Sequence, residues 1–187
     1  MTVAPADVLP YLRMGGGREP GAALAARIAA LTEEALAAAR PARTWRRIAV
    51  PGGWLETSKA LSLRLAGCRD VYLACGTLGA PFDAWHRQVS VKSAADALVV
   101  QAIGAAAIEK VMDSIEDDIR AELAPGESLV ARYSPGYADF PLAAQRELLA
   151  LLDAPRKVGV SLTDSLLMVP SKSVSAVIGV RSGSAAT

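Results

Sequence analysis

Residues 93–123 read SAADALVVQAIGAAAIEKVMDSIEDDIRAEL and form one long segment with helical spacing. Ser93 and Asp96 match the capping-box pattern, in which a hydroxyl and an acid satisfy free N–H groups at a helix start. Apolar side chains then recur on one helical face, at Val99, Ile103, Ala107, Val111 and Ile115. Pro125-Gly126 breaks the pattern. The segment therefore predicts a long central helix that buries one face.

Helical and strand-like segments flank this helix on both sides. The other expected helices cover residues 20–40, 57–65, 80–88 and 142–152. The expected strands cover residues 43–50, 70–75, 128–133, 166–169 and 173–180. Short strands near the C-terminus do not fit regular βαβ repetition, so we predict a mixed α/β (α+β) class with long helices on a small, largely antiparallel sheet. We assign residues 1–180 to a single domain and residues 181–187 to a flexible tail.

Composition narrows the function classes. The 187 residues suit one domain, and 52% apolar with 21% charged residues is a globular composition. A net charge of +1 gives no basic field for nucleic acid or an anionic membrane. We find no signal-peptide pattern, and the apolar stretch 94–108 is shorter than the ~20 residues that a membrane helix needs. We expect a cytoplasmic protein with no nucleic-acid or membrane partner.

Cysteine and histidine are too few for several kinds of site. One histidine, His86, and two cysteines, Cys68 and Cys75, exclude a Cys/His zinc cage and a disulfide scaffold. We expect two buried thiols and no metal site. No G-x-S-x-G, H-E-x-x-H or P-loop motif occurs, so no catalytic residue is assigned.

Two further features have competing interpretations. Residues 106–127 hold two basic and seven acidic residues, which we interpret as a solvated helix face, with a partner-facing or cation-facing surface as the alternative. Residues 74–79, ACGTLG, follow a strand and precede a helix, where backbone N–H groups could hold an anion. Because the dinucleotide fingerprint is incomplete, a tight turn is favoured, and a nucleotide-dependent enzyme built around Gly76–Gly79 is kept as an alternative.

The segment RYSPGYADFP, residues 132–141, carries most of the functional information. Pro135-Gly136 suits the centre of a type II turn, which leaves backbone groups free to face a ligand. Arg132 offers a planar fork for a carboxylate or phosphate, and no acid lies within three positions of it, so we expect the fork to be free. Tyr133 and Tyr137 offer aromatic faces that attract a sulfonium or other cation. The alternative is a structural turn with packed tyrosines and a surface arginine.

Two motifs make the chain recognisable. Residues 132–137 resemble the R-x-x-P-G-Y motif of the reactivation (activation) domain of cobalamin-dependent methionine synthase. Residues 159–170, GVSLTDSLLMVP, are similar to that family's G-x-x-L-T-[ED]-S-x-x-M-x-P segment, which Ser173-Val174-Ser175 continues. The resemblance is strongest over 128–180, and the length and Thr77-Leu78-Gly79 look like free-standing bacterial versions of the domain.

The resemblance implies a function. The family's domain binds S-adenosylmethionine and docks on a module that carries cobalamin. An electron donor such as flavodoxin reduces the inactive cob(II)alamin, and S-adenosylmethionine then methylates it. The chain would therefore be an accessory subunit in methionine biosynthesis that meets cobalamin only through a partner, a methionine synthase or other corrinoid protein lacking this domain.

The resemblance also implies site residues. Arg132 would hold the ligand's carboxylate, Ser134 and Gly136 would contact the ligand through the turn, and Tyr137 would lie near both ligand and corrinoid, with Tyr133 also facing the corrinoid. Asp7 starts a D-x-x-P-[FY] stretch and would pair with the ligand's amino group, with a helix N-cap as its alternative. Glu109 could match an acid on the family's long helix, but its register is ambiguous, and we interpret it as solvated.

The chain also departs from the family. It has no D-x-H-x-x-G corrinoid-ligand motif and no folate or methyltransferase module, so we expect no methionine-forming turnover from it alone. Residues 181–187 contain no aromatic residue, whereas the family's domain continues into an aromatic tail that helps to hold the ligand. The runner-up interpretation is a stand-alone small-molecule-binding protein of the same fold that serves another corrinoid pathway or ligand.

Overall fold

A four-stranded antiparallel sheet forms the centre of the computed structural model, which describes residues 1–12, 14 and 20–182. Its strands follow the order β1-β2-β6-β3. Their bounds are β1 (Ala42–Ala49), β2 (Cys68–Thr77), β6 (Ser173–Ser182) and β3 (Glu127–Leu129). The two central strands pair from Thr77 opposite Ser173 to Cys68 opposite Arg181. The predicted mixed class with an antiparallel sheet is confirmed.

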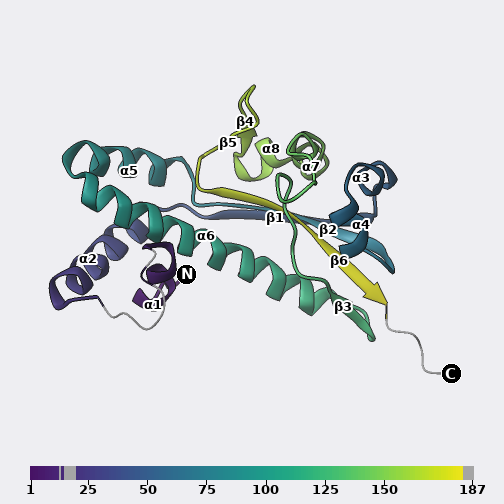
Figure 1. Ribbon diagram of the computed structural model, residues 1–187, viewed down its shortest axis with the longest axis horizontal. Coiled ribbons are helices and arrows are strands. Elements are labelled where there is room, and N and C mark those ends of the chain that lie inside the picture. Colours follow the sequence, from purple (N-terminus) through teal and green to yellow (C-terminus); the bar gives the residue numbers. More distant parts are fainter. Residues whose placement is uncertain (13, 15–19, 183–187) are drawn as a thin grey trace.

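The long helix α6 (Ala94–Glu122) lies on one face of this sheet and extends beyond it (Figure 1). The apolar positions predicted to face the core are all buried, at Val99, Ile103, Ala107, Val111 and Ile115. Alternate residues of β2 face opposite sides, as the two-residue period of a strand requires. Tyr72 and Ala74 pack with the helix residues Met112 and Ile115, and together they form the layer between helix and sheet.

The opposite face of the sheet carries short elements: α3 (Gly52–Thr57), α4 (Lys59–Arg64), α7 (Ala144–Leu152) and α8 (Ala154–Val158). A hairpin of β4 (Ser161–Leu162) and β5 (Met168–Val169) projects beside them (Figure 1). Leu73 and Cys75 of β2 pack here against Phe140 and Leu148. The sheet therefore lies between α6 and this layer of short helices.

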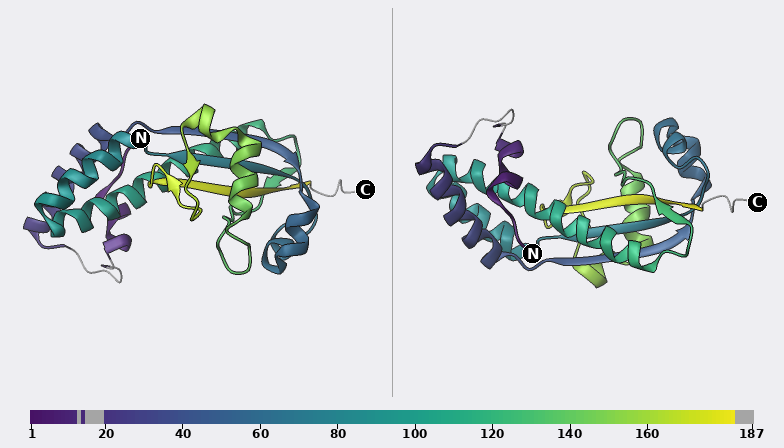
Figure 2. Two further views of the ribbon diagram at one scale, coloured as in Figure 1. Left: turned by 90° about the horizontal axis from the view of Figure 1, so that it is seen from above. Right: turned by 90° about the horizontal axis from the view of Figure 1, so that it is seen from below.

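A helical end completes the fold. The N-terminal half of α6 packs with α2 (Ala22–Ala38) and α5 (Ala80–Lys92), away from most of the sheet (Figure 2). The short α1 (Pro5–Val8) and the 3₁₀ helix η1 (Leu9–Leu12) contact α6 from the N-terminus. One of the two hydrogen bonds of the predicted capping box is formed at the start of α6: Ser93 accepts the Asp96 N–H at 3.1 Å. The Asp96 carboxylate instead pairs with Arg27 at 2.7 Å.

Several predicted boundaries were wrong. The strand expected over 128–133 is interrupted: β3 ends at Leu129, and Tyr133 forms a separate bridge with Val177. Helix α3, which starts at Gly52 and buries Trp54, was not predicted, although the strand expected over 43–50 does end before Pro51. Arg181 and Ser182, assigned to the tail, are the last residues of β6, and the rest of that tail, 183–187, lies outside the described residues.

Within the described residues, no helix is both long and apolar enough to cross a membrane. The same residues contain no group of His, Cys, Asp and Glu side chains arranged to hold a metal ion.

Candidate ligand-binding pocket

A tight turn at Ser134–Tyr137 forms the centre of the candidate site. The Tyr137 N–H donates to the Ser134 carbonyl at 3.3 Å, and Gly136 has a φ of 92°. A positive φ at the third position defines the type II turn and favours glycine there, so the predicted turn is confirmed. Two further bonds close the loop behind it: Gly136 donates to the Phe140 carbonyl at 2.8 Å, and Phe140 donates to the Tyr137 carbonyl at 2.9 Å.

This turn is fixed at both of its ends. Tyr133 exchanges two backbone hydrogen bonds with Val177 of β6, at 2.9 and 2.8 Å. Downstream, the Asp139 carboxylate accepts the Ser58 hydroxyl at 2.7 Å and the Lys59 N–H at 2.9 Å at the start of α4. The Ser58 hydroxyl, aided by backbone N–H groups of α4, lowers the pKa of Asp139. A negative charge is also favourable at a helix N-terminus.

Aromatic rings line the turn. The Tyr133 ring stacks on the buried Phe140 ring at a centroid distance of 6.2 Å and an interplanar angle of 12°. The Arg64 guanidinium lies 4.7 Å from the Tyr133 centroid, within the range of a cation–π contact. Tyr137 lies 6.2 Å from Tyr133 and is 65% exposed. Tyr133 is therefore held between neighbours, while Tyr137 faces solvent.

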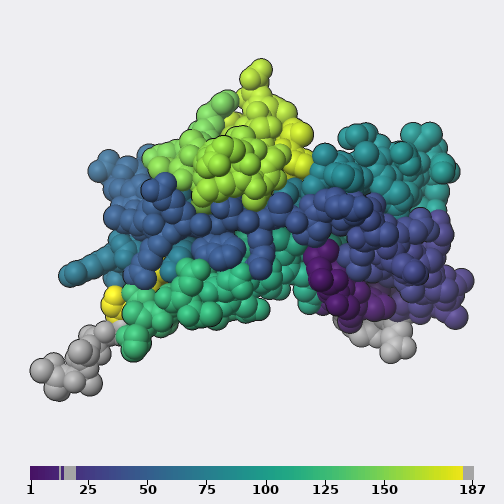
Figure 3. Space-filling model, turned by 180° about the vertical axis from the view of Figure 1, so that it is seen from behind, coloured from purple at the N-terminus to yellow at the C-terminus, as the bar shows by residue number. Residues whose placement is uncertain are grey.

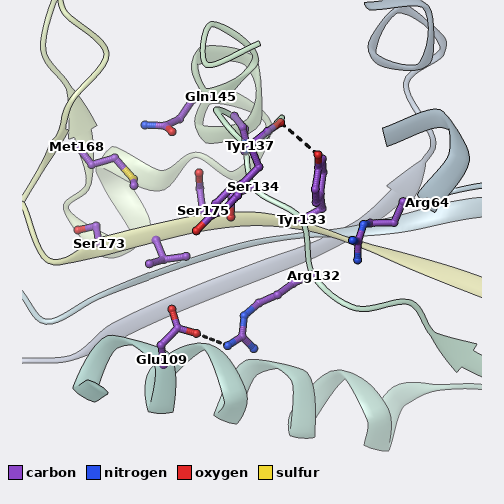
Figure 4. Close-up of a pocket in the computed structure, with 12 residues that line it drawn as sticks. Arg64, Glu109, Arg132, Tyr133, Ser134, Tyr137, Gln145, Met168, Ser173 and Ser175 are labelled. Atoms are coloured by element: carbon purple, nitrogen blue, oxygen red, sulfur yellow. Dashed lines mark hydrogen bonds and ion pairs between the residues drawn. The ribbon is translucent and has the colours of Figure 1, made fainter. Parts of the chain in front are cut away.

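A cavity of about 500 Å³ lies between this turn, α4, α6 and strands β5 and β6. Figure 4 shows Arg132, Tyr133 and Ser134 on one side of it and Met168, Ser173 and Ser175 on another. The two sequence motifs therefore meet at one cavity, since Met168 belongs to the downstream motif. The volume falls in the ordinary range of small-molecule sites, roughly 300–1,000 Å³.

The Arg132 fork is not free, contrary to the expectation from its sequence neighbours. Its guanidinium pairs with three carboxylates of α6: Glu109, Asp113 at 2.9 Å and Glu116 at 2.5 Å. Positions 109, 113 and 116 lie on one face of a helix, so α6 presents all three acids to the turn. Burial would lower the pKa of Arg132, but hydrogen bonds to Glu109, Glu116 and Asp113 raise it overall.

Part of the Arg132 guanidinium still lacks a protein partner. Nη1 donates to Asp113 and Glu116, and Nη2 donates to Glu109. A guanidinium has five N–H donors, so Nε–H and one N–H of Nη2 have no partner among the described residues. Those two donors can form a bidentate pair with a carboxylate.

Most acids of the acidic block pair with arginines of this chain, so the block is not simply the solvated helix face that was predicted. Beyond the three acids at Arg132, Asp118 pairs with Arg43 at 2.6 Å, and Glu127 pairs with Arg47 at 2.6 Å. Both arginines belong to β1, which lies beside the C-terminal half of α6 on the face shown in Figure 3. Asp118 therefore joins α6 to β1, whereas Glu127 belongs to β3 and joins that strand to β1.

Asp7 does not line the cavity. Its carboxylate accepts the Ala4 N–H at 2.9 Å and pairs with Lys110 at 3.0 Å. These contacts, the Ala4 N–H foremost, lower the pKa of Asp7. Ala4 is the N-cap of α1 and Asp7 is the third residue of that helix, so the N-cap alternative for Asp7 is wrong by three positions. Its predicted contact with a ligand amino group stays a prediction.

The glycine turn after β2 is tightly packed. A Cβ on Gly79, whose φ is 84°, would lie 2.7 Å from the Arg40 carbonyl oxygen. The Gly79 N–H donates to the Thr77 hydroxyl at 3.0 Å, and the Leu78 N–H donates to the Lys172 carbonyl at 2.8 Å. With these N–H groups occupied, the segment is the predicted tight turn and offers no phosphate cradle.

The two thiols are both free, and Cys75 is buried while Cys68 is half-buried. Burial raises the pKa of Cys75 to about 12. The prediction of two buried thiols is therefore confirmed for Cys75 and wrong for Cys68, and a thiol with a pKa raised as that of Cys75 is a poor nucleophile.

Three residues of the cavity were not predicted from the sequence. Glu109, interpreted as solvated, lines it beside Arg132, and Arg64 and Gln145 also line it. The spacing of Glu109, Asp113 and Glu116 could have suggested a shared basic partner on one helix face. Nothing local to Arg64 indicated the site, because its contact with Tyr133 joins distant segments.

A comparison with models of known protein families agrees with the two motifs. The profile described as "Vitamin B12 dependent methionine synthase, activation domain" matches residues 87–185, more than half of the chain. The chain belongs to this family. Both motifs and α6 residues Glu109, Asp113 and Glu116 lie inside the matched part of this activation-domain protein, whereas Asp7 and Arg64 lie before it.

One similar solved structure is the crystal structure of the MetH reactivation domain bound to AdoHcy. It shares 21% sequence identity with this chain at a TM-score of 0.45. The similarity covers 59% of this chain and 39% of the MetH chain. This chain therefore spans less than half of the length of the MetH structure. None of the curated proteins matches the sequence.

Proposed function

We propose that this cavity binds S-adenosylmethionine, and that the chain supports the reductive remethylation of cobalamin on a partner methionine synthase in the cytoplasm. The observation that carries the proposal is the pairing of Arg132 and Glu109 at one cavity wall, next to the aromatic turn. Membership of the activation-domain family and the AdoHcy bound to the similar MetH domain support it.

The paired charges suit the amino-acid end of this ligand. The unpartnered Nε and Nη2 donors of Arg132 would take the carboxylate in a bidentate contact. Glu109 would accept hydrogen bonds from the ammonium group, exchanging part of its contact with Arg132 for the ligand. A cation and an anion side by side match a zwitterion, whose two charges are also adjacent.

The turn suits the reacting end. Tyr133 and Tyr137 would place aromatic faces near the sulfonium, and the Ser134–Gly136 backbone would contact the ligand. Bound S-adenosylmethionine would supply the methyl group to reduced cobalt, and an electron donor such as flavodoxin would supply the reduction.

An exposed apolar rim suits the docking of the partner. Tyr137 is 65% exposed, and Leu142, Leu167 and Val169 are 40, 64 and 49% exposed. Methyl transfer needs the donor and cobalt within about 3–3.5 Å, so the corrinoid must approach the cavity mouth closely. We place it against Tyr133 and Tyr137, with residues 1–180 acting as a single unit.

The test reconstitutes the reaction. Purified chain, a methionine synthase lacking this domain, a reductant and S-adenosylmethionine are mixed, and the cob(II)alamin spectrum is followed. Recovery of methylcobalamin should depend on the chain and should be slowed in Glu109→Gln. Glu122→Gln is the matched control, because Glu122 lies on the same helix but bonds the Trp45 N–H outside the cavity. Recovery no faster with the chain than without it, for every cobalamin protein tried, would contradict the role, and a stand-alone binder would replace it.

A further inference from the structure

Glu116 is a buried charged side chain, with 9% of the residue exposed. Its two oxygens hold two different guanidiniums: Oε1 accepts from Arg132 at 2.5 Å, and Oε2 accepts from Arg120 at 2.8 Å. Arg120 is itself paired with Asp117 at 2.7 Å. A buried carboxylate with both oxygens bonded to cations has little freedom to move, because either bond would be lost in low dielectric.

Glu116 stands behind Arg132 relative to the ligand cavity. Of the three acids that hold Arg132, Glu109 lines the cavity, whereas Asp113 and Glu116 do not. Glu116 instead lines a separate hollow of about 520 Å³ with Arg120 and the 127–131 segment. Among its contacts, the one with Arg132 links Glu116 to the wall of the ligand cavity.

We propose that Glu116 is a positioning residue, which fixes the rotation of the Arg132 guanidinium so that its Nε and Nη2 edge stays available to a ligand carboxylate. The inference rests on the proposed function of the cavity. Nη1 donates to both Glu116 and Asp113. Side-chain exposure distinguishes the two acids: Glu116 is 11% exposed and Asp113 is 53% exposed. Glu116 is thus the rigid member of the pair.

The arrangement requires two acceptor oxygens. A carboxylate supplies one to each arginine, but a glutamine supplies one oxygen and one NH₂ group. In Glu116→Gln the amide nitrogen must face one of the two guanidiniums, donor against donor. Either Arg132 or Arg120 is then displaced, although the volume of the side chain is unchanged.

The closing experiment compares two ligands, S-adenosylmethionine and its decarboxylated analogue, by calorimetric titration. Glu116→Gln should weaken S-adenosylmethionine about tenfold, the effect of a misplaced charged hydrogen bond, and should change binding of the analogue less than about twofold. Asp117→Asn is the matched control, because Asp117 pairs with Arg120 without touching Arg132, and both affinities should stay unchanged.

A second measurement needs no ligand. In protein with ¹⁵N-labelled arginine, the Nη signals of Arg132, assigned by their loss in Arg132→Lys, should be resolved in the wild type and averaged by rotation in Glu116→Gln. If the glutamine variant does not fold, Glu116→Asp keeps both oxygens on a shorter stem and should show a smaller loss, again limited to the ligand with a carboxylate.

The outcomes separate the two proposals. A wild type that binds neither ligand contradicts the proposed function, while the arginine signals still test the rotation. A wild type that binds both ligands, with a variant that weakens both equally or neither, overturns the positioning role.

Discussion

Two glycine turns, one directly after β2 and one after the isolated bridge at Tyr133, differ in what surrounds them. Gly79 and Gly136 both have a positive φ, of 84° and 92°. A Cβ on Gly79 would meet the Arg40 backbone oxygen at 2.7 Å, whereas one on Gly136 would meet a flexible Leu142 side-chain carbon at 3.2 Å. Leu78 beside the first glycine is fully buried, and Tyr137 beside the second is 65% exposed. A turn with a glycine at positive φ is therefore a packing element in one place and part of a pocket wall in the other.

The largest expected effect is on the packed turn. Gly79→Ala combines a positive φ with a backbone clash, so the free energy of unfolding should fall by roughly 2–4 kcal/mol in urea denaturation. Gly126→Ala is the control, because Gly126 has a φ of 85° but no atom within 4 Å of its Cβ position. Backbone strain alone should cost it about 1 kcal/mol. Equal losses in the two variants would contradict the packed-turn account.

Substitutions at the pocket turn should instead change the affinity for S-adenosylmethionine. Arg132→Ala should weaken S-adenosylmethionine binding by about 2–3 kcal/mol, as expected for a lost charged contact. Arg132→Lys should restore only part of it, because lysine lacks the fork. Arg156→Ala removes an exposed ion pair far along the chain and should leave the affinity unchanged. An unchanged calorimetric affinity in a folded Arg132→Ala protein would end the assignment.

These two turns also show what sequence can predict. The helix over 94–122, the two central strands and the Pro135-Gly136 turn follow from local signals: apolar spacing, a capping serine and turn residues. The carboxylates around Arg132 do not, because they lie 16 to 23 residues away in sequence and reach it only after α6 packs on the sheet. The sequence neighbours of Arg132 contain no acid, so they led to the wrong prediction that its guanidinium has no partner.

Helix α3 shows a second kind of limit. Pro51-Gly52-Gly53 is a strong local turn signal, and glycine disfavours helix by about 1 kcal/mol per residue. The helix forms nevertheless, because Trp54 is buried and donates its indole N–H to Glu147 at 2.6 Å. Propensity is a weak prior where a distant partner fixes a large side chain.

A smaller effect is expected on stability when the exposed side of the pocket turn is truncated. Tyr137→Ala should change the free energy of unfolding by less than about 0.5 kcal/mol, because its ring is mostly exposed. The same change should slow recovery of methylcobalamin in the reconstituted mixture. Val91→Ala, at a position 88% exposed on α5, should affect neither quantity. A normal recovery rate in Tyr137→Ala would place the corrinoid elsewhere.

The smallest effect concerns how the pocket turn is attached to α4. The pKa of Asp139 lies below the ordinary 3.8, chiefly because of the Ser58 hydroxyl. Its stabilising contribution is therefore complete above about pH 4 and is lost as the pH falls through the lowered pKa. Between pH 5 and 2.5, the midpoint temperature of thermal unfolding should fall slightly less for Asp139→Asn than for the wild type. Parallel profiles would show that this carboxylate does not secure the turn.

The most direct test of the contrast between the turns is a titration of ¹⁵N-labelled protein with S-adenosylmethionine, followed through backbone amide shifts. We expect the largest changes at Tyr133, Ser134, Gly136 and Tyr137, with smaller ones around Glu109 and Ser175, which line the same cavity. The amides of residues 76–79 should stay unmoved. Saturable changes centred on residues 76–79, or none anywhere at millimolar ligand, would contradict the assignment of the pocket.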